Sequence, residues 1–349
     1  MTEQKIVGIV GATGLTGLQL ISLLSRHRYI KKVYMFSRSK SGQYIHQLFP
    51  FLKGIVEGQL VEPTEENLDK CDTLFLALPH GESMKYVRNF TAKQIIDLGA
   101  DFRIPDSDVF SRIYKQEHEC EELIKEFAYG ICELNELEIK TSQYISAPGC
   151  IATSILLAIY PLLLSDICEN EFIIDTKVSS SGSGINNKSE SNIHPIRSNS
   201  IRAYSLHKHR HIYEISHFIK SKLDREISLS LNTFSVDLVR GLTSTIYFKV
   251  RKNITEKELN KIYRKYYSES EFVRVFSSRT GYERYPNPKL LIGSNFCDIG
   301  ISLNGENGVI VSALDNLIKG AAGQAIQNFN MINSYPINES LDLVPVYPV

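Results

Sequence analysis

Cys150 has the residue type and the surroundings of a nucleophile. It follows a Pro-Gly turn in the stretch ISAPGCIATS and opens an apolar run, IATSILLAIYPLLL, with helical spacing. A thiol in the first turn of a helix lies near unpaired backbone N–H groups and the positive end of the helix dipole, which favour the reactive thiolate. Four other cysteines lack such a setting, and we expect them to be buried packing residues: Cys71, Cys132, Cys168 and Cys297.

A nucleophilic cysteine needs an acid or a base as a partner, and the run SLHKHRHIYEI supplies three histidines. His207, His209 and His211 alternate, so in an extended segment they would share one face, directly before a predicted helix. Metal binding by this pattern is the rival interpretation. Lys208 and Arg210 weigh against it, because cations close to a metal ion repel it, and the same cations favour an anionic, phosphorylated substrate. Three histidines in charged stretches are expected to be solvated: His27, His46 and His118.

The N-terminal elements predict where a cofactor binds. KIVGIV (5–10) is typical of a buried parallel strand, GATGLTG (11–17) follows it, and LQLISLLSRH has helical spacing of leucines. Gly11 permits a tight turn, Gly14 lets the backbone approach a pyrophosphate, and Gly17 allows close packing of the helix on the strand. A merely structural tight turn is the rival interpretation. The residues assigned to the dinucleotide site are Gly11, Thr13, Gly14, Leu15, Thr16 and Gly17.

The end of the second predicted strand, KKVYMFSRSKSG, indicates which nicotinamide cofactor fits. A site for NAD usually has an acidic residue about 20 residues after the last glycine, where it bonds the ribose 2′-hydroxyl. This chain has Ser37 and Arg38 there, followed by Ser39 and Lys40. A hydroxyl and a guanidinium suit a 2′-phosphate, so we predict NADP(H). A solvated basic loop is the alternative.

Two later stretches continue an open α/β sheet, CDTLFLALPHG (71–81) and KQIIDLGADFRIPD (93–106). Ligands of such sheets bind at the carboxyl ends of the strands. Arg103 is therefore placed to bind an anionic group of a substrate, and a structural ion pair is equally consistent with the sequence.

Composition excludes several classes of partner. The chain has 39 basic and 39 acidic residues, so its charge does not indicate binding to nucleic acid or to a membrane surface. No apolar run approaches the ~20 residues that span a bilayer, and the N-terminus lacks the features of a secretion signal. Six cysteines without regular spacing argue against disulfides and zinc. We expect a cytoplasmic enzyme without a metal.

Several longer motifs resemble one family. APGCIATS, LHKHRHIYEI, ALDNLIKGAAGQAIQNFN (313–330) and SLDLVPVYPV are similar to N-acetyl-gamma-glutamyl-phosphate reductase, as are GATGLTG, LGADFRIPD and YGICELNE, so the resemblance spans the chain. It implies an α/β fold like that of aspartate-semialdehyde dehydrogenase. A Rossmann-type NADP-binding domain (1–148 and 316–349) would receive a returning C-terminal helix, beside a mixed α+β catalytic and dimerisation domain (149–315). Asn316, at the start of the late helix, would contact the nicotinamide.

The resemblance also implies a reaction. Cys150 would attack an acyl phosphate and expel phosphate, and NADPH would reduce the resulting thioester to a semialdehyde. His209 is our choice for the acid/base, with His211 as the alternative. Arg103 and Arg210 are candidate clamps for a phosphate or a carboxylate.

Two substrates compete within the family. One is free N-acetyl-glutamyl phosphate, and the other is glutamate or 2-aminoadipate phosphate attached to a small acidic amino-group carrier protein, in lysine or arginine synthesis. Three stretches resemble the carrier-linked branch, at 42–54, 192–204 and 234–241. The segment 188–211 is also basic, with one carboxylate, Glu190, which suits an acidic protein partner, although it would equally serve the substrate phosphate alone. Its cations are Lys188, Arg197, Arg202, Lys208 and Arg210.

Two other classes share parts of this pattern. A dehydrogenase acting on a free aldehyde would not need the basic cluster, and a catalytically inactive NADP-binding regulator would tolerate loss of a reactive thiol. The β-rich region 231–313, with its NGENG hairpin turn, is expected from the resemblance to provide a subunit interface in a homodimer or homotetramer.

Overall fold

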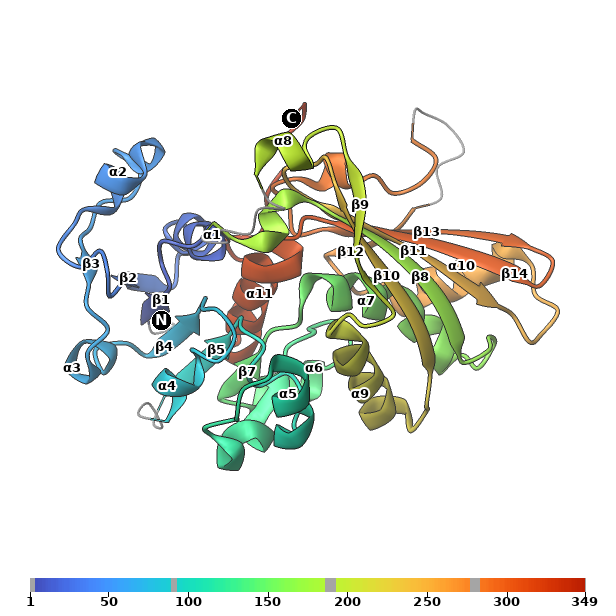
Figure 1. The fold of residues 1–349 in the computed structure, drawn as a ribbon, viewed down its shortest axis with the longest axis horizontal. Coiled ribbons are helices and arrows are strands. Elements are labelled where there is room, and N and C mark those ends of the chain that lie inside the picture. The colour runs from blue at the N-terminus through green and yellow to red at the C-terminus, as the bar shows by residue number, and fades with distance from the viewer. Residues whose placement is uncertain (1–3, 89–92, 186–192, 277–282, 349) are drawn as a thin grey trace. The chain divides into compact units, whose positions relative to one another are not determined.

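The protein folds into two compact units (Figure 1). Unit 1 comprises Met1–Pro148 and Ala321–Asp342, and unit 2 comprises Gly149–Gly320 and Leu343–Val349. The structure is a computed structural model that describes residues 4–88, 93–185, 193–276 and 283–348.

The observed division differs from the expected one near the C-terminus. We expected the chain to return to the first domain at Asn316 and to remain there. It stays in unit 2 for about one more helical turn, because Asp315 forms an ion pair with Arg240 there. The last residues also belong to unit 2, where the Val346 N–H donates to the Ile292 carbonyl.

Unit 1 is built on a seven-stranded sheet in the order β3-β2-β1-β4-β5-β7-β6, and all its neighbouring strands are parallel. Its apolar, β-branched strands are buried on both faces, as the continuous apolar runs of the sequence predict. The strands are β1 (Lys5–Val10), β2 (Ile30–Phe36), β3 (Leu60–Val61), β4 (Thr73–Leu76), β5 (Gln94–Asp97), β6 (Phe127–Tyr129) and β7 (Tyr144–Ser146).

The helices of unit 1 include one from the end of the chain, α11, which contacts α1 and α6 (Figure 1). The α-helices are α1 (Leu15–Leu24), α2 (Ile45–Leu48), α3 (Glu65–Leu68), α4 (Met84–Val87), α5 (Ser107–Tyr114), α6 (Glu136–Thr141) and α11 (Gly323–Ile332). Short 3₁₀ turns occur at Pro50–Leu52 and Glu121–Glu126.

Unit 2 carries a mixed seven-stranded sheet in the order β12-β13-β14-β11-β8-β10-β9. The pairs β8–β10 and β12–β13 are parallel and the others antiparallel. The strands are β8 (Glu171–Val178), β9 (Ile201–Leu206), β10 (Ser228–Val236), β11 (Leu242–Lys249), β12 (Val273–Phe276), β13 (Cys297–Asn304) and β14 (Asn307–Leu314). The expected hairpin turn at NGENG joins β13 to β14. The expected fold class, a Rossmann-type unit with a mixed α+β unit, is confirmed.

Helix α7 (Cys150–Leu164) is the central helix of unit 2 and contacts β11, β14, α9 (His211–Leu223) and α10 (Glu256–Tyr266). The other helices of unit 2 are α8 (His194–Arg197), 3₁₀ turns at Ser180–Ser183 and Pro288–Leu291, and a π-helical turn at Ile318–Ala322, which crosses into unit 1.

Helix α7 contains a proline that frees one of its carbonyls. Pro161 has no N–H, so the Leu157 carbonyl, four residues earlier, loses its helical partner. The Tyr267 hydroxyl donates to this carbonyl at 2.5 Å, and the Tyr263 hydroxyl donates to the next one, Ala158, at 2.5 Å. Both hydroxyls belong to α10 or to the residue directly after it, and the Tyr267 bond satisfies the buried carbonyl that the proline would otherwise leave unpaired.

Two of the three histidines expected in solvent are buried. The His27 ring packs edge-on against Phe329 and lies 2.7 Å from the Asn330 amide oxygen. The His118 ring packs against Phe110, and its Nε2 lies 2.8 Å from the Asp101 carbonyl. The partners of His27 come from the far end of the chain and those of His118 from the preceding segment, so charged neighbours in the sequence were a poor guide to exposure. His46 is half-buried.

Within the described residues, no helix combines the length and the apolar character needed to cross a membrane.

Candidate active site

Helix α7 places Cys150 at its first residue. Gly149 is the N-cap, with extended backbone angles and no side chain to occupy the first N–H groups. Cys150 is half-buried, whereas the other five cysteines are buried, including the four expected to be packing residues. Cys150 therefore combines access for a substrate with the positive end of a helix, which favours a thiolate.

Gly320 fixes the position of Cys150 from one side. A Cβ atom added at Gly320 would lie 2.5 Å from the Cys150 Cβ atom, well inside van der Waals contact. Gly320 lies in the π-helical turn, a local irregularity that often marks a functional site. Its lack of a side chain therefore allows this turn to approach the cysteine closely.

Glu214 ties the turn before the cysteine to helix α9. Its Oε1 accepts the Gly149 N–H at 2.8 Å, and its Oε2 lies 3.8 Å from Nε2 of His211, three residues earlier on the same helix. Both side chains are buried, His211 at 4% and Glu214 at 2% exposure. The carboxylate therefore connects Cys150's turn with a histidine in the low-dielectric interior, where charge interactions are strong.

His209 is buried, and within the described residues no carboxylate pairs with it. Burial, reinforced by the charge of the neighbouring Arg210, lowers the pKa of His209 to about 4. The His211 backbone N–H points to Nδ1 of His209 at 3.3 Å, so Nδ1 is the acceptor and the ring proton resides on Nε2. His209 is thus a neutral ring that offers an N–H donor.

The histidine run is not the extended segment that the alternation predicted. Strand β9 ends at Leu206, His207 adopts a left-handed conformation with φ 56°, and α9 begins at His211. The turn separates the side chains: His207 is exposed with Nδ1 3.0 Å from the Ser230 hydroxyl, while His209 and His211 pack with ring centroids 4.7 Å apart. Among the described residues, no cluster suited to a metal ion occurs.

Asn316 lies in unit 2 and holds a serine loop. Its Oδ1 accepts the Gly241 N–H at 2.7 Å and the hydroxyls of Ser179 and Ser181 at 3.1 and 3.3 Å. The adjacent Asp315 is fully buried, and the Arg240 guanidinium pairs with it at 2.7 Å. The contact predicted between Asn316 and a nicotinamide stays a prediction.

The glycine loop of unit 1 has the shape that a dinucleotide needs. Gly11 has φ +87°, and a Cβ atom there would lie 2.2 Å from the Ala77 carbonyl oxygen. A Cβ atom at Gly17 would lie 2.3 Å from the Gly11 oxygen, so the helix packs as closely as predicted. Gly14, the N-cap of α1, meets only one atom, at 3.4 Å, which leaves room for a phosphate at the N–H groups of Leu15 and Thr16.

Ser37 and Arg38 follow β2 directly, at the carboxyl end of a strand next to the glycine loop's strand. The Arg38 guanidinium lies over the Tyr86 ring, 5.4 Å from its centroid, and 4.0 Å from the Glu82 carboxylate. Its side chain is 59% exposed, so this long ion pair is weak and the guanidinium remains accessible to an anion.

Arg103 is buried and bonded to backbone. Its Nε donates to the Ala147 carbonyl and its Nη2 to the Leu98 carbonyl, each at 2.9 Å. It therefore joins the segments that follow β5 and β7 in unit 1. These bonds are structural, as in the alternative left open by the sequence, but they go to backbone carbonyls and not to the carboxylate of an ion pair. The predicted contact with a substrate anion stays a prediction. Arg210 is exposed at the N-cap of α9.

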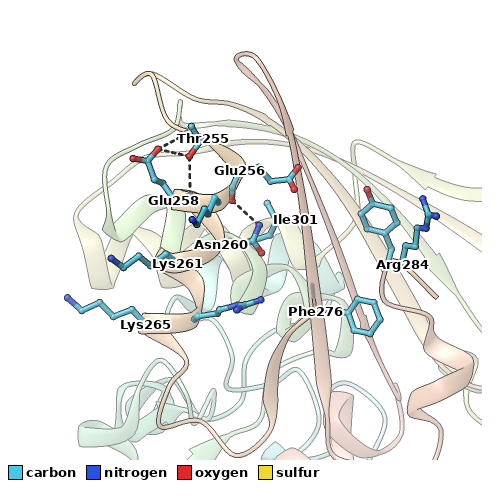
Figure 2. Close-up of a pocket in the computed structure, with 12 residues that line it drawn as sticks. Thr255, Glu256, Glu258, Asn260, Lys261, Lys265, Phe276, Arg284 and Ile301 are labelled. Atoms are coloured by element: carbon cyan, nitrogen blue, oxygen red, sulfur yellow. Dashed lines mark hydrogen bonds between the residues drawn. The ribbon is translucent and has the colours of Figure 1, made fainter. Parts of the chain in front are cut away.

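A pocket of about 1320 Å³ lies between α10 and residues of β12, β13 and 284–285 (Figure 2). Lys261 and Arg264 line it with Phe276, Arg284 and other residues of unit 2. Figure 2 shows Lys261 and Lys265 projecting away from Phe276, so these cations do not converge on one ligand. None of the predicted catalytic side chains of the described chain lines this pocket.

Two family models match the chain, one within its N-terminal part and one within its C-terminal part. Residues 6–142 match the family model described as "Semialdehyde dehydrogenase, NAD binding domain", and residues 150–316 match "Semialdehyde dehydrogenase, dimerisation domain". The chain belongs to the semialdehyde dehydrogenase family. It is accordingly an NAD(P)-dependent oxidoreductase, which confirms the predicted enzyme class and the nicotinamide cofactor.

Curated relatives cover nearly the whole chain. A protein of Nitrosopumilus maritimus is 38% identical, over 98% of this chain and 99% of its own, and one of Pyrococcus furiosus is 41% identical, over 95% of both. Both carry the name LysW-L-2-aminoadipate/LysW-L-glutamate phosphate reductase. The predicted resemblance to the carrier-linked branch is thereby confirmed.

Solved semialdehyde dehydrogenases share the fold at low identity. Aspartate semialdehyde dehydrogenase II of Vibrio cholerae is 14% identical with a TM-score of 0.72, covering 95% of this chain and 98% of its own. The enzyme of Candida albicans, solved with NADP, is 16% identical with a TM-score of 0.71, covering 96% and 100%.

Sequence reasoning missed three side chains of this site. Glu214, Asp315 and Arg240 are engaged within unit 2 around the cysteine turn and the Asn316 loop. A signal existed for Glu214, since it lies three residues after His211 on the face of a helix that also carries Ile215. Neither Asp315 nor Arg240 has a local pattern that sets it apart from a solvated charge.

Proposed function

We propose that this protein reduces an acyl phosphate to a semialdehyde with NADPH, through a thioester on Cys150. The supporting observation is the connection of the cysteine turn to a buried histidine through one carboxylate, by the bond from Gly149 to Glu214 and the proximity of Glu214 to His211. A nucleophile at a helix N-terminus beside a base held by a third group is the general arrangement of covalent catalysis.

In the first half-reaction the Cys150 thiolate attacks the carbonyl carbon of the acyl phosphate. The bond from this carbon to the phosphate oxygen breaks, phosphate leaves, and a thioester remains on the cysteine. We assign the acid/base role to His211 rather than to His209, because the Glu214 carboxylate stabilises the imidazolium that forms when His211 takes the thiol proton. This reverses the preference derived from the sequence.

His209 then has a different role. It is neutral and carries its proton on Nε2. Its Nε2–H is therefore suited to donate a hydrogen bond to the substrate carbonyl oxygen, on which negative charge develops during the attack. NADPH, when bound, supplies the hydride that reduces the thioester. The thiohemiacetal oxygen then expels the cysteine sulfur, and the semialdehyde leaves.

The residues of unit 1 fit the cofactor. The loop from Gly11 to Gly17 would hold the pyrophosphate, with Gly14 giving the backbone its close approach. Ser37 and Arg38 would hold the 2′-phosphate. The exposed Arg38 guanidinium makes only a weak ion pair, and this position carries no acidic residue that would repel a phosphate.

The substrate is, in this proposal, 2-aminoadipate or glutamate phosphate attached to an acidic carrier protein. Two observations support it: the names of the relatives and the basic character of the segment around β9. Of its cations, Arg197 and Arg202 are half-buried and Lys208 and Arg210 are exposed, while Lys188 lies outside the described residues. Such a surface attracts an acidic partner and fixes its orientation.

NADPH oxidation tests this function. Wild type is expected to turn over the carrier-linked acyl phosphate and to use free N-acetyl-glutamyl phosphate far less efficiently, whereas Cys150→Ser is expected to lose turnover with both. Unchanged turnover in Cys150→Ser would refute the covalent mechanism. Efficient use of the free compound would refute the carrier-linked substrate and leave the reaction type standing.

A homodimer is part of the same proposal. The sheet of unit 2 is covered by α7, α9 and α10, and the alternate residues of β8 and β11 point away from them. Ile173 and Tyr247 are direct cross-strand neighbours on this second face, 50% and 43% exposed. An apolar pair on an uncovered sheet face suits a second copy of the chain.

A further inference from the structure

A row of buried hydroxyl groups lies between α7 and the sheet of unit 2. Thr176, Ser244 and Ser312 are direct cross-strand neighbours on β8, β11 and β14. Ser154 of α7 sits over this row, with its Oγ 3.1 Å from the Ser244 Oγ and 3.0 Å from the Ser312 Oγ. The Thr176 Oγ1 lies 3.0 Å from the Ser244 Oγ. We call these four residues the hydroxyl row.

The hydroxyl row is dry and internally bonded. All four side chains have zero exposure, and the thiol of Cys297, also fully buried, extends the row with its Sγ 3.5 Å from the Ser312 Oγ. The Ser154 hydroxyl points as donor toward both sheet serines, so its single proton is shared between them. Loss of one member leaves its neighbours short of a partner.

The rest of this interface is apolar. Helix α7 buries residues on all sides, and those around Ser154 include Ile151, Ile155 and Ala158. Apolar contacts are non-directional, so they hold a helix against a sheet without setting its register along the sheet. An all-apolar interface would bury this helix about as well, because replacing both partners of a hydrogen bond by apolar groups is nearly neutral for stability. The hydroxyls therefore have a role other than stability.

The register of α7 sets the position of the cysteine. Ser154 follows Cys150 by four residues, so both lie on the same side of the helix, about 6 Å apart along its axis. The cysteine turn tolerates little displacement: Gly149 donates to Glu214 at 2.8 Å, and Gly320 leaves no space beside Cys150. A shift of about 1 Å would stretch the Gly149–Glu214 bond beyond hydrogen-bond geometry.

We propose that Ser154 is a positioning residue, and that the hydroxyl row sets the register of α7 so that Cys150 stays aligned with Glu214 and its histidine. This inference rests on the proposed function, in which Cys150 is the nucleophile. Ser154 touches neither substrate nor cofactor in it and acts only through the helix.

Two variants separate positioning from stability. Ser154→Ala removes the central member and takes one hydrogen-bond partner from each of Ser244 and Ser312, which keep only Thr176 and the weakly bonding Cys297 thiol, respectively. The quadruple variant Ser154→Ala/Thr176→Val/Ser244→Ala/Ser312→Ala removes the whole row, so that no hydroxyl of the row is left unpaired. The measurements are Tm, kcat and KM for the carrier-linked acyl phosphate, and the rate at which iodoacetamide alkylates Cys150, the one half-buried cysteine of the six.

We expect Ser154→Ala to lower both Tm and kcat. The quadruple variant should recover Tm but not kcat, which is expected to stay at least about tenfold below wild type because small misplacements of catalytic groups are costly. KM should remain within about twofold, since substrate binding is not what the row controls. The alkylation rate of Cys150 should differ from that of wild type by more than about twofold in both variants, since it reports the thiol's surroundings.

The control is Thr73→Val in unit 1, which removes another fully buried hydroxyl, one that donates to the Gln94 amide oxygen at 2.7 Å. It is expected to lower Tm and to leave kcat and alkylation unchanged. The proposal is overturned if the quadruple variant recovers kcat together with Tm, or if its alkylation rate equals that of wild type. Absence of turnover in the wild type would instead refute the proposed function, and the alkylation rates would still decide the role of the row.

Discussion

The Gly149 N–H donates to the Glu214 carboxylate at 2.8 Å, so the residue before Cys150 is held by the helix that begins with His211. The two residues are 65 positions apart in the sequence. One carboxylate oxygen accepts this bond and the other faces His211. In the proposed function, Glu214 therefore couples the position of Cys150 to the protonation of its base.

Glu214→Gln should separate these two roles. The glutamine oxygen can still accept the Gly149 N–H, so the turn is kept, but the negative charge that stabilises the His211 imidazolium is lost. We expect kcat to fall about 100-fold, the usual size of a general acid–base contribution, with little change in KM. Steady-state NADPH oxidation measures this.

Glu214→Ala extends the same experiment, because it also removes the bond to Gly149 and should lower Tm as well as kcat. The matched control is Glu226→Gln, an exposed carboxylate shortly after α9, which should change neither quantity. A kcat for Glu214→Gln near that of wild type would contradict the assignment of His211 as the base.

Arg38→Ala tests the discrimination between NADPH and NADH. The side chain is 59% exposed and its nearest carboxylate oxygen, on Glu82, is 4.0 Å away, so the guanidinium is open to a phosphate. Its loss should raise KM for NADPH by about tenfold or more, which corresponds to ~1.4 kcal/mol of binding, and should leave KM for NADH unchanged. Lys31→Ala is the control. Equal increases for both cofactors would show that Arg38 does not contact the 2′-phosphate.

Local patterns account for what the sequence predicted correctly. The strand, glycine loop and helix from residue 5 to residue 24 form one continuous unit, and Cys150 begins a helix because an apolar run follows a Pro-Gly turn. Residues whose roles depend on distant partners were not predicted. Glu214 shares a helix face with His211 and Ile215, but no local pattern predicts that the Gly149 N–H donates to it.

The turn at 207–211 shows the same limit. Alternating histidines favour an extended segment, but the left-handed conformation of His207 ends the strand and buries His209 beside His211. Burial of the apolar face of the following helix favours this turn over an extended segment. The alternation of residues in a five-residue run does not reveal that effect.

Charge on the uncovered face of the unit 2 sheet should prevent self-association. In the double variant Ile173→Lys/Tyr247→Lys, two cations would replace an exposed apolar cross-strand pair, and burying them against a second copy is unfavourable. We expect the dimer to become a monomer, measured by light scattering on a sizing column. Leu137→Lys, an exposed apolar residue of unit 1 at 83% exposure, is the control. A dimer that survives the double variant would place the interface elsewhere.

Asp97 should make the protein less stable as pH rises from acidic to neutral. It is fully buried at the end of β5, where burial, reinforced by the charge of Asp101, raises its pKa from 3.8 to about 7. Ser83 and Gly99 donate to its Oδ1 at 2.6 and 2.9 Å and offset part of this effect. The unfolded state therefore loses this proton near pH 4 while the folded state keeps it until about pH 7.

The sign follows from this difference. The stability that Asp97 contributes is fully present below about pH 4, falls as pH rises toward 7 and is constant above it. At ~1.4 kcal/mol per pKa unit, the free energy of unfolding decreases by at most ~4 kcal/mol over this range. Asp97→Asn resembles the protonated form at every pH, so its Tm relative to wild type should rise between about pH 5 and about pH 8. Thermal unfolding across this range measures it, with the exposed Asp69→Asn as control. A difference in Tm that does not depend on pH would mean that Asp97 is ionised in the folded protein throughout.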